Sequence, residues 1–129
     1  MSTTKQAIHT SDAPGTIGPY SQAIQVGNTV YISGQIPLIP QTMLLSGKDI
    51  ESQARQVFDN LQAICSQAGG SLDYLVKIQI FLTDLTHFPV VNNIMTDYFS
   101  APFPARATIE VSRLPKDVQI EVDGIMVLN

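Results

Sequence analysis

The sequence predicts a single α+β domain spanning residues 1–129, with two helices packed on one face of a mixed β-sheet. Three observations predict this class. Apolar and polar residues alternate along several short segments, as in strands buried on one side. Two longer segments repeat apolar residues with the period of an α-helix. Each of these helices follows a strand and leads into another, which leaves the second face of the sheet free for a subunit interface.

In the N-terminal part of the chain, the residue pattern predicts two or three strands. We expect a short edge strand over Lys5–His9 and two further strands over Gln22–Val26 and Thr29–Ser33. Gly27-Asn28 lies between the latter two and suits a tight hairpin turn. Residues 38–48 carry breaking residues and are expected to form an exposed loop.

The clearest helix is predicted over Asp49–Ala68. Asp49 is a suitable N-cap, and Gly69-Gly70 ends the helix. Its apolar residues form one stripe, and Cys65 lies on that stripe. Cys65 is therefore predicted to be a core residue rather than a nucleophile.

A strand over Leu75–Thr83 and a second helix over residues 87–99 follow. The strand alternates, so that one face is predicted to carry Val76, Ile78, Ile80 and Leu82. Thr86 is the expected cap of the helix, and Pro89 is acceptable because it falls in the first turn.

The segment Ala101–Glu121 is expected to organise the chain. Two prolines give a stiff entry to an alternating strand, in which Ala107 and Ile109 lie on one face and Arg106 on the other. A turn over Leu114–Asp117 leads to a last strand that carries Glu121. Arginine has a planar fork of donors suited to a carboxylate or phosphate, although an arginine on a strand is more often an exposed surface residue.

Composition excludes several classes of function. The net charge is −4, the pI is about 4.8, and the seven basic residues are scattered, which argues against a nucleic-acid partner. No apolar run is long enough to span a membrane, and residues 1–6 lack the apolar stretch of a secretory signal. The single cysteine fits a reducing compartment, and the cytoplasm is the expected location.

No cofactor and no metal are expected. The sequence contains no P-loop, no GxGxxG and no nucleophile elbow, and neither His9 nor His87 has a partner at metal-ligand spacing.

Three motifs resemble those of the Rid family of reactive intermediate deaminases. Together they run from about Ala13 to the C-terminus. The matching stretches are Ala13-Pro14-Gly15 with Ile17–Ala23, Ile32–Pro37, and Phe103–Val111 continuing through Leu114-Pro115-Lys116 to Ile120-Glu121.

The resemblance implies a chorismate-mutase-like fold, assembled as a homotrimer whose sheets form a central β-barrel, with sites in the clefts between subunits. It also implies a deaminase without cofactor, which hydrolyses 2-iminopropanoate and 2-iminobutanoate to 2-oxo acids and ammonia and so removes reactive enamine and imine intermediates.

By match to the family motif, Arg106 holds the substrate carboxylate and Glu121 orients the attacking water and accepts its proton. The pocket is lined by Tyr20, Ser33, Gly34, Asn92 and Thr108. The backbone of Thr108 helps to hold the water, and Phe88, one turn before Asn92, offers an apolar wall. Many relatives have cysteine where this chain has Thr108, but a mechanism based on water does not require a thiol there.

Three other functions stay open. A non-catalytic module that binds a small carboxylate such as a 2-oxo acid would use Arg106 but would not need Glu121. A ribonuclease or translation inhibitor is disfavoured by the acidic charge. A chorismate-mutase-like isomerase would need more cations for its dianionic substrate than Arg106 alone.

Overall fold

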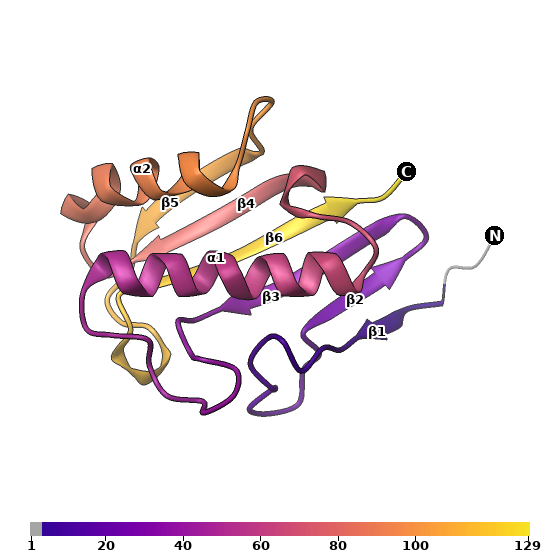
Figure 1. The fold of residues 1–129 in the computed structure, drawn as a ribbon, viewed down its shortest axis with the longest axis horizontal. Helices are drawn as coiled ribbons and strands as arrows, with labels where there is room; N and C mark the ends of the chain where they lie inside the picture. The colour runs from indigo at the N-terminus through magenta and orange to yellow at the C-terminus, as the bar shows by residue number, and fades with distance from the viewer. Residues whose placement is uncertain (1–3) are drawn as a thin grey trace.

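The computed structural model describes residues 4–129, which form a six-stranded sheet with two α-helices on one face (Figure 1). The sheet order is β1-β2-β3-β6-β4-β5, and β4 and β5 are its parallel pair. The predicted α+β class, with a mixed sheet and both helices on one side, is confirmed. The elements are β1 (Gln6–Ile8), β2 (Ala23–Val26), β3 (Thr29–Gln35), α1 (Ile50–Gln67), β4 (Leu75–Leu82), α2 (Phe88–Tyr98), β5 (Ala105–Glu110) and β6 (Ile120–Val127).

The hydrophobic core lies between the helices and the sheet. Alternate residues of β4 and β6, such as Ile80 and Val122, are fully buried on this face. They pack against the apolar stripe of α1, which includes Phe58 and Leu61. Among residues 4–129, no helix has the length and apolar character needed to cross a membrane.

Helix α1 begins and ends where the sequence predicts. The Asp49 carboxylate accepts a hydrogen bond from the Ser52 backbone N–H at 2.9 Å, which is an N-cap contact. Gly69 ends the helix with φ 97°, a conformation that glycine adopts readily. Cys65 is fully buried, and burial raises the pKa of its thiol to about 12, as befits a core residue.

Three local predictions are wrong. Val76 is 48% exposed, because a bulge between Leu75 and Lys77 shifts the register and starts the buried face at Leu75. Thr86 is not the cap of the second helix. Instead, Asp84 accepts from the Thr86 N–H at 2.9 Å and caps a 3-10 turn that leads into α2. Leu38, expected in an exposed loop, is 2% exposed.

Strand β5 alternates as predicted, but its apolar side does not face the core. Thr108 is level with buried Ile80 of β4 and so lies on the helix side, whereas Ile109 lies on the open face and is 49% exposed. Large apolar side chains are also exposed on the open face of the other strands. They are Tyr31, Val76 and Val127. A patch of this kind is typical of an interaction surface.

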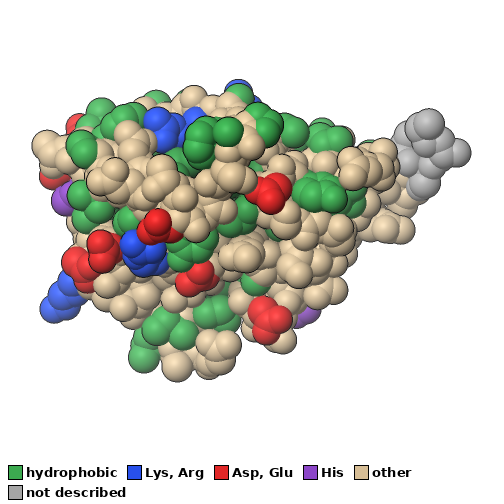
Figure 2. All heavy atoms as spheres, turned by 45° about the horizontal axis from the view of Figure 1, so that its top comes forward, with side chains coloured by type: hydrophobic (Ala, Val, Ile, Leu, Met, Phe, Trp, Pro, Cys, Tyr) green, Lys and Arg blue, Asp and Glu red, His purple; other side chains and the backbone are tan. Residues whose placement is uncertain are grey.

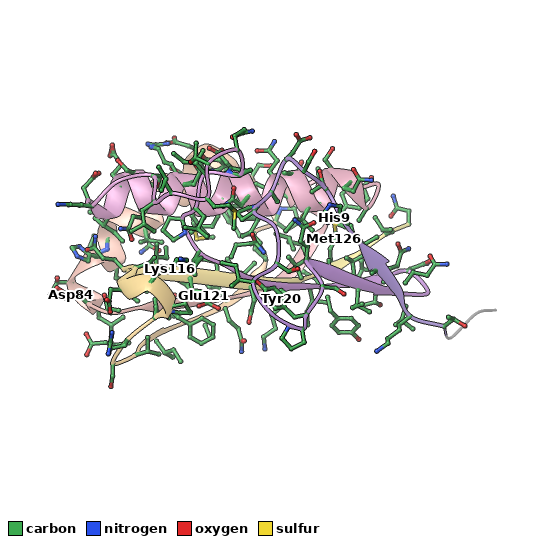
Figure 3. All side chains as sticks on the ribbon, turned by 90° about the horizontal axis from the view of Figure 1, so that it is seen from below. His9, Tyr20, Asp84, Lys116, Glu121 and Met126 are labelled. Carbon is green, nitrogen blue, oxygen red and sulfur yellow. The ribbon has the colours of Figure 1, made fainter. Side chains whose placement is uncertain are left out.

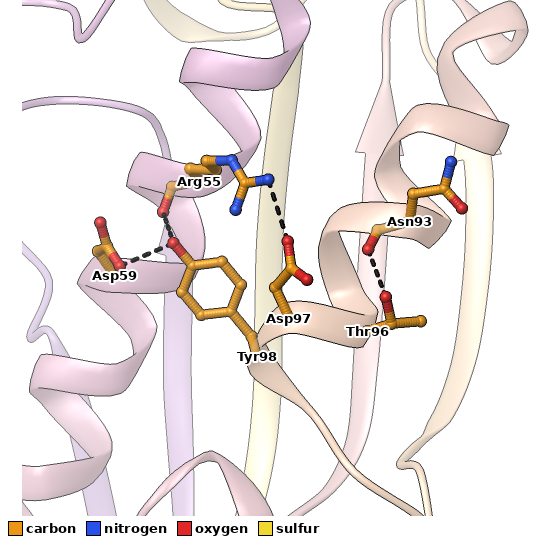
Figure 4. Close-up of polar contacts among 6 residues, drawn as sticks. All are labelled: Arg55, Asp59, Asn93, Thr96, Asp97 and Tyr98. Carbon is orange, nitrogen blue, oxygen red and sulfur yellow. Dashed lines mark hydrogen bonds and ion pairs between the residues drawn. The ribbon is translucent and has the colours of Figure 1, made fainter.

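Polar contacts tie α2 to α1, as Figure 4 shows. Arg55 pairs with Asp97 at 3.0 Å. The Tyr98 hydroxyl is 2.9 Å from the Asp59 carboxylate, to which it donates, and 3.2 Å from the Arg55 carbonyl. These contacts set the position of α2 over the edge of the sheet, where it meets β5.

We expect Tyr98→Phe to lower the free energy of unfolding at neutral pH by about 0.5–1.5 kcal/mol, the usual value of one hydrogen bond. Burial and the Asp59 carboxylate raise the pKa of Tyr98 from 10.0 to about 12. The stability contributed by the protonated hydroxyl is therefore complete below pH 10 and is lost between pH 10 and 12. Denaturant titrations across this range should show the advantage of the wild type over Tyr98→Phe shrinking.

Tyr74→Phe is the matched control, because its hydroxyl makes no hydrogen bond within residues 4–129. An equal loss in both variants would contradict a specific role of the Tyr98 contacts.

Candidate functional site

The first part of the candidate site surrounds Arg106. This residue is the second of β5, and its side chain lies on the helix side of the sheet against α2. Its Nη1 donates to the Asn92 amide oxygen at 2.6 Å and contacts the Met95 sulfur at 3.4 Å. The guanidinium also lies 5.0 Å from the centroid of the Phe88 ring, a cation–π distance. Residues of α2 therefore fix the orientation of the Arg106 side chain.

This orientation leaves one edge of the guanidinium unused. Nε and Nη2 of Arg106 make no hydrogen bond to any residue in the range 4–129. These two nitrogens form the parallel pair of donors that binds a carboxylate with two hydrogen bonds. Arg106 also opens onto a hollow of about 430 Å³, lined by Asn92, Met95, Thr96, Phe103, Pro104 and Arg106. We call this set the arginine half of the site.

The second part surrounds Glu121, the second residue of β6. Figure 3 views the two layers edge-on and shows Glu121, Lys116 and Tyr20 at the level of the sheet. They border a hollow of about 470 Å³, which falls within the range of about 300–1,000 Å³ found for ligand pockets. The lining residues are Ile17, Tyr20, Ser33, Gly34, Ile36, Pro115, Lys116 and Glu121. We call this set the glutamate half.

Glu121 depends on the absence of a side chain at Gly34. A Cβ on Gly34 would overlap the Glu121 carboxylate, so a side chain at this position would force the carboxylate to move from its present place. Burial raises the pKa of Glu121 above its ordinary value, and the nearby Asp123 carboxylate raises it further. Within residues 4–129, Glu121 makes no ion pair. It is therefore a carboxylate of increased basicity without a cationic partner.

A loop held by Gln22 carries Tyr20. The buried amide of Gln22 accepts from the Thr10 N–H at 2.7 Å and donates to the carbonyl oxygens of Thr10 and Pro14 at 3.0 and 2.9 Å. It thus fixes the segment that precedes Ile17 and Tyr20, which line the glutamate half. Sequence reasoning missed Gln22, because a buried amide has no local pattern that separates it from an exposed one. The Ser33 hydroxyl donates to the Ser21 carbonyl at 2.6 Å and braces the same loop.

Thr108 lines neither hollow. Its hydroxyl oxygen is buried without a hydrogen-bond partner among residues 4–129. Asn92 lines the arginine half, and its oxygen is engaged with Arg106. Phe88, predicted as an apolar wall, lies against the Arg106 guanidinium.

The two halves lie on opposite faces of the sheet in one copy of the chain. Arg106 is level with Ile78, whose side chain is buried under the helices. Glu121 is level with Phe81, one residue beyond buried Ile80, and so faces the open side. β5 and β6 are also separated by β4, which puts their backbones about 10 Å apart. Arg106 and Glu121 of one copy therefore cannot contact the same small molecule.

Comparison with known proteins gives consistent matches over most of the chain. The family model described as Endoribonuclease L-PSP matches residues 10–128. RidA from the Antarctic bacterium Psychrobacter sp. has a TM-score of 0.93 and 48% identity, covering 95% of this chain and 99% of that one. This chain belongs to the Rid family.

Two other Rid proteins bear on function. A protein of Dermatophagoides farinae named 2-iminobutanoate/2-iminopropanoate deaminase is 43% identical over 96% of this chain and 97% of its own length. The structure of E. coli TdcF with bound serine has a TM-score of 0.92 and 40% identity, covering 96% of this chain and 99% of that one.

Among residues 4–129 of this Rid protein, no group of three or more His, Cys, Asp or Glu side chains could hold a metal ion.

We expect Gln22→Leu to lower the free energy of unfolding by about 2–4 kcal/mol, because it leaves several buried backbone groups of the Thr10–Pro14 segment without partners. Chemical denaturation at equal protein concentration measures this change. Gln25→Leu is the control, since the Gln25 amide donates only to the Gly27 carbonyl at the surface. We expect it to cost less than about 1 kcal/mol. Equal losses in the two variants would contradict the bracing role of Gln22.

Proposed function

We propose that this Rid protein is a cofactor-independent deaminase that hydrolyses 2-iminopropanoate and 2-iminobutanoate to the 2-oxo acids and ammonia. One observation carries the proposal. The arginine half presents a free, oriented pair of donors, and the glutamate half presents an unpaired carboxylate with a raised pKa. These are the two groups needed to hold the carboxylate of an imino acid and to activate a water beside its imine carbon. The named deaminase at 43% identity supports the same reaction.

The reaction makes limited chemical demands. Water adds its oxygen to the imine carbon and the C=N bond becomes a single bond, which gives a carbinolamine. In this step one proton of the water ends on the nitrogen. The C–N bond then breaks as the C=O bond forms, the hydroxyl proton of the carbinolamine is transferred to the nitrogen, and ammonia leaves. Positioning of the two reactants supplies up to about 7–11 kcal/mol of barrier reduction, and general acid–base catalysis typically adds a factor of about 100–10,000.

Each half has its own task in this reaction. Arg106 holds the substrate carboxylate through Nε and Nη2, while Asn92 and Phe88 keep the guanidinium in place. Glu121 orients the water and accepts its proton, which its raised pKa favours. Tyr20, Ser33 and Gly34 border the substrate in the glutamate half. The predicted contact of water with the Thr108 backbone belongs to the same proposal.

The assembled site requires a second copy of the chain. Since Arg106 and Glu121 of one copy face opposite sides, the arginine half of one subunit must meet the glutamate half of its neighbour. We place this junction in a homotrimer in which the open sheet faces form the central barrel. The exposed apolar side chains of that face, Tyr31, Val76, Ile109 and Val127, support burial between copies.

Two alternatives make different demands. A sensor of small carboxylates is compatible with Arg106, and TdcF, crystallised with bound serine, shows that a relative binds a small amino acid. However, an unpaired Glu121 beside a bound anion serves no purpose in a sensor. The ribonuclease that the family description names would need a basic surface. On the face in Figure 2, Lys and Arg side chains are scattered rather than gathered in one patch.

The first test measures how fast 2-iminobutanoate disappears when an amino-acid oxidase generates it in the presence of a trapping amine. We expect the wild type to accelerate its loss, and Arg106→Ala and Arg106→Lys to lose at least about 100-fold of this activity. Lysine keeps the charge but cannot form the paired hydrogen bonds. Arg113→Lys is the control, because Arg113 pairs at the surface with Asp117 and lines neither hollow.

No acceleration by the wild type would refute the deaminase. Full activity in Arg106→Ala would support the reaction but would show that another group binds the substrate carboxylate.

The second test asks whether the site is shared between subunits. Arg106→Ala and Glu121→Gln should each be inactive, yet equal amounts refolded together should recover about a quarter of the wild-type activity, because one site in four then receives both intact halves. The mixture is compared with each variant refolded alone. Absence of recovery, with the mixed oligomers verified by mass spectrometry, would show that each site comes from one chain.

A further inference from the structure

The turn between β5 and β6 brings a positive charge to the glutamate half. This 3-10 turn, Pro115–Asp117, places Lys116 on the border of the hollow that holds Glu121 (Figure 3). Within residues 4–129, the Lys116 ammonium makes no ion pair. Lysine side chains at the surface often make no ion pair. The backbone of the turn and the charges around it therefore bear on whether Lys116 has a role at the hollow.

The backbone of the turn is held in an uncommon conformation. Lys116 and Asp117 have φ values of 57° and 56°, in the left-handed region that side chains other than glycine rarely adopt. The turn is closed by hydrogen bonds from the Asp117 N–H to the Leu114 carbonyl at 3.1 Å and from the Val118 N–H to the Pro115 carbonyl at 3.3 Å. Lys116 is thus presented by a fixed turn rather than by an open loop.

The turn also neutralises its own carboxylate. Both Nε and Nη2 of Arg113 donate to one Asp117 oxygen, at 3.2 and 2.7 Å. The charge that the turn leaves unpaired at the hollow is therefore the Lys116 ammonium. Apart from Lys116 and Glu121, the side chains that line the hollow carry no charge at neutral pH. Without Lys116, the lining that one copy contributes to the glutamate half would carry the formal charge of Glu121 alone, on a chain of net charge −4.

We infer that Lys116 is a positioning residue that draws the anionic substrate into the glutamate half while Arg106 of the neighbouring subunit takes the carboxylate. This inference rests on the proposed deaminase function. A free cation at the mouth of a site raises the rate of association with an anion, and the effect weakens as salt screens it. The role is therefore visible in kcat/KM and in its dependence on salt.

The test compares Lys116→Gln and Lys116→Arg with the wild type at about 0.01 M and about 1 M salt, where the screening length falls from about 30 Å to about 3 Å. Competition between the enzyme and the trapping amine gives kcat/KM for 2-iminobutanoate. Calorimetry gives the Kd of the product, 2-oxobutanoate. Lys5→Gln is the matched control, because it removes the same charge just before β1, which lies at the other end of the molecule from the turn (Figure 1).

At low salt we expect Lys116→Gln to lose about 3- to 10-fold in kcat/KM, with the loss in KM rather than kcat. At high salt the difference should fall below about twofold, and Lys116→Arg should stay within about twofold of the wild type throughout. Equal values for Lys116→Gln and the wild type at low salt would overturn the inference. A loss that persists at high salt and in Lys116→Arg would also overturn it, because that result indicates a structural role of the turn.

A wild type that does not accelerate imine loss would refute the deaminase rather than the role of Lys116. Calorimetry then decides that role alone. Weaker binding of 2-oxobutanoate by Lys116→Gln at low salt would support it, and equal binding or none would contradict it.

Discussion

The alternation of side chains across the sheet is the constraint on which the candidate site depends. Because α1 and α2 cover one face only, the pleat places Arg106 on the helix side and Glu121 on the open side. On one face, the two groups of a single copy could pair with each other, and the guanidinium and the carboxylate would both be occupied. Their separation keeps Nε and Nη2 of Arg106 free and leaves Glu121 unpaired. In the proposed assembly, the substrate carboxylate then meets an unoccupied arginine.

Buried amide side chains hold the irregular segments around the glutamate half. Gln22 binds the backbone of the Thr10–Pro14 loop, and Asn60 of α1 donates to the Ile36 and Leu38 carbonyls just beyond β3. Gln53 accepts from the Gln119 N–H at the entry to β6 and donates to the Gly47 carbonyl. Backbone groups in such segments have no strand to pair with, so these amides satisfy them. The helix layer therefore both covers the core and fixes the loops that border Glu121.

The sequence predicts what local pattern determines and fails where distant contacts decide. Asp49 and Gly69 specify both ends of α1 through interactions within a few residues, and the alternation of β6 gives its buried face. The alternation along β5 is as predicted, but the pattern alone does not tell which face meets the core, and in this edge strand the apolar residues lie on the open side. The predicted face of Val76 is wrong because the bulge that exposes this side chain depends on how β4 pairs with β6, which the segment itself does not reveal.

The residues of the candidate site follow the same division. The family motif predicts that Arg106 and Glu121 belong to the site, but their placement on opposite faces depends on β4 lying between β5 and β6. That order is a property of the whole sheet and of no single segment. Asn92 was expected to contact the ligand, and its hydrogen bond to Arg106 depends equally on how α2 packs over β5. Gln22 lies in the matching stretch Ile17–Ala23, but its role as a brace is not visible from its residue type, since only burial distinguishes it from Gln25.

The surroundings of Glu121 bear on how one carboxylate can serve both stages of the proposed hydrolysis. It must take a proton as water adds to the imine carbon, and a proton must then reach the nitrogen as ammonia leaves. A carboxylate of ordinary pKa is a weak base and holds a proton only briefly at neutral pH. Partial burial and the Asp123 charge raise the pKa of Glu121, which brings that pKa closer to the pH at which the enzyme works. Gly34 allows this position of the carboxylate, which occupies the space that a Cβ on residue 34 would fill.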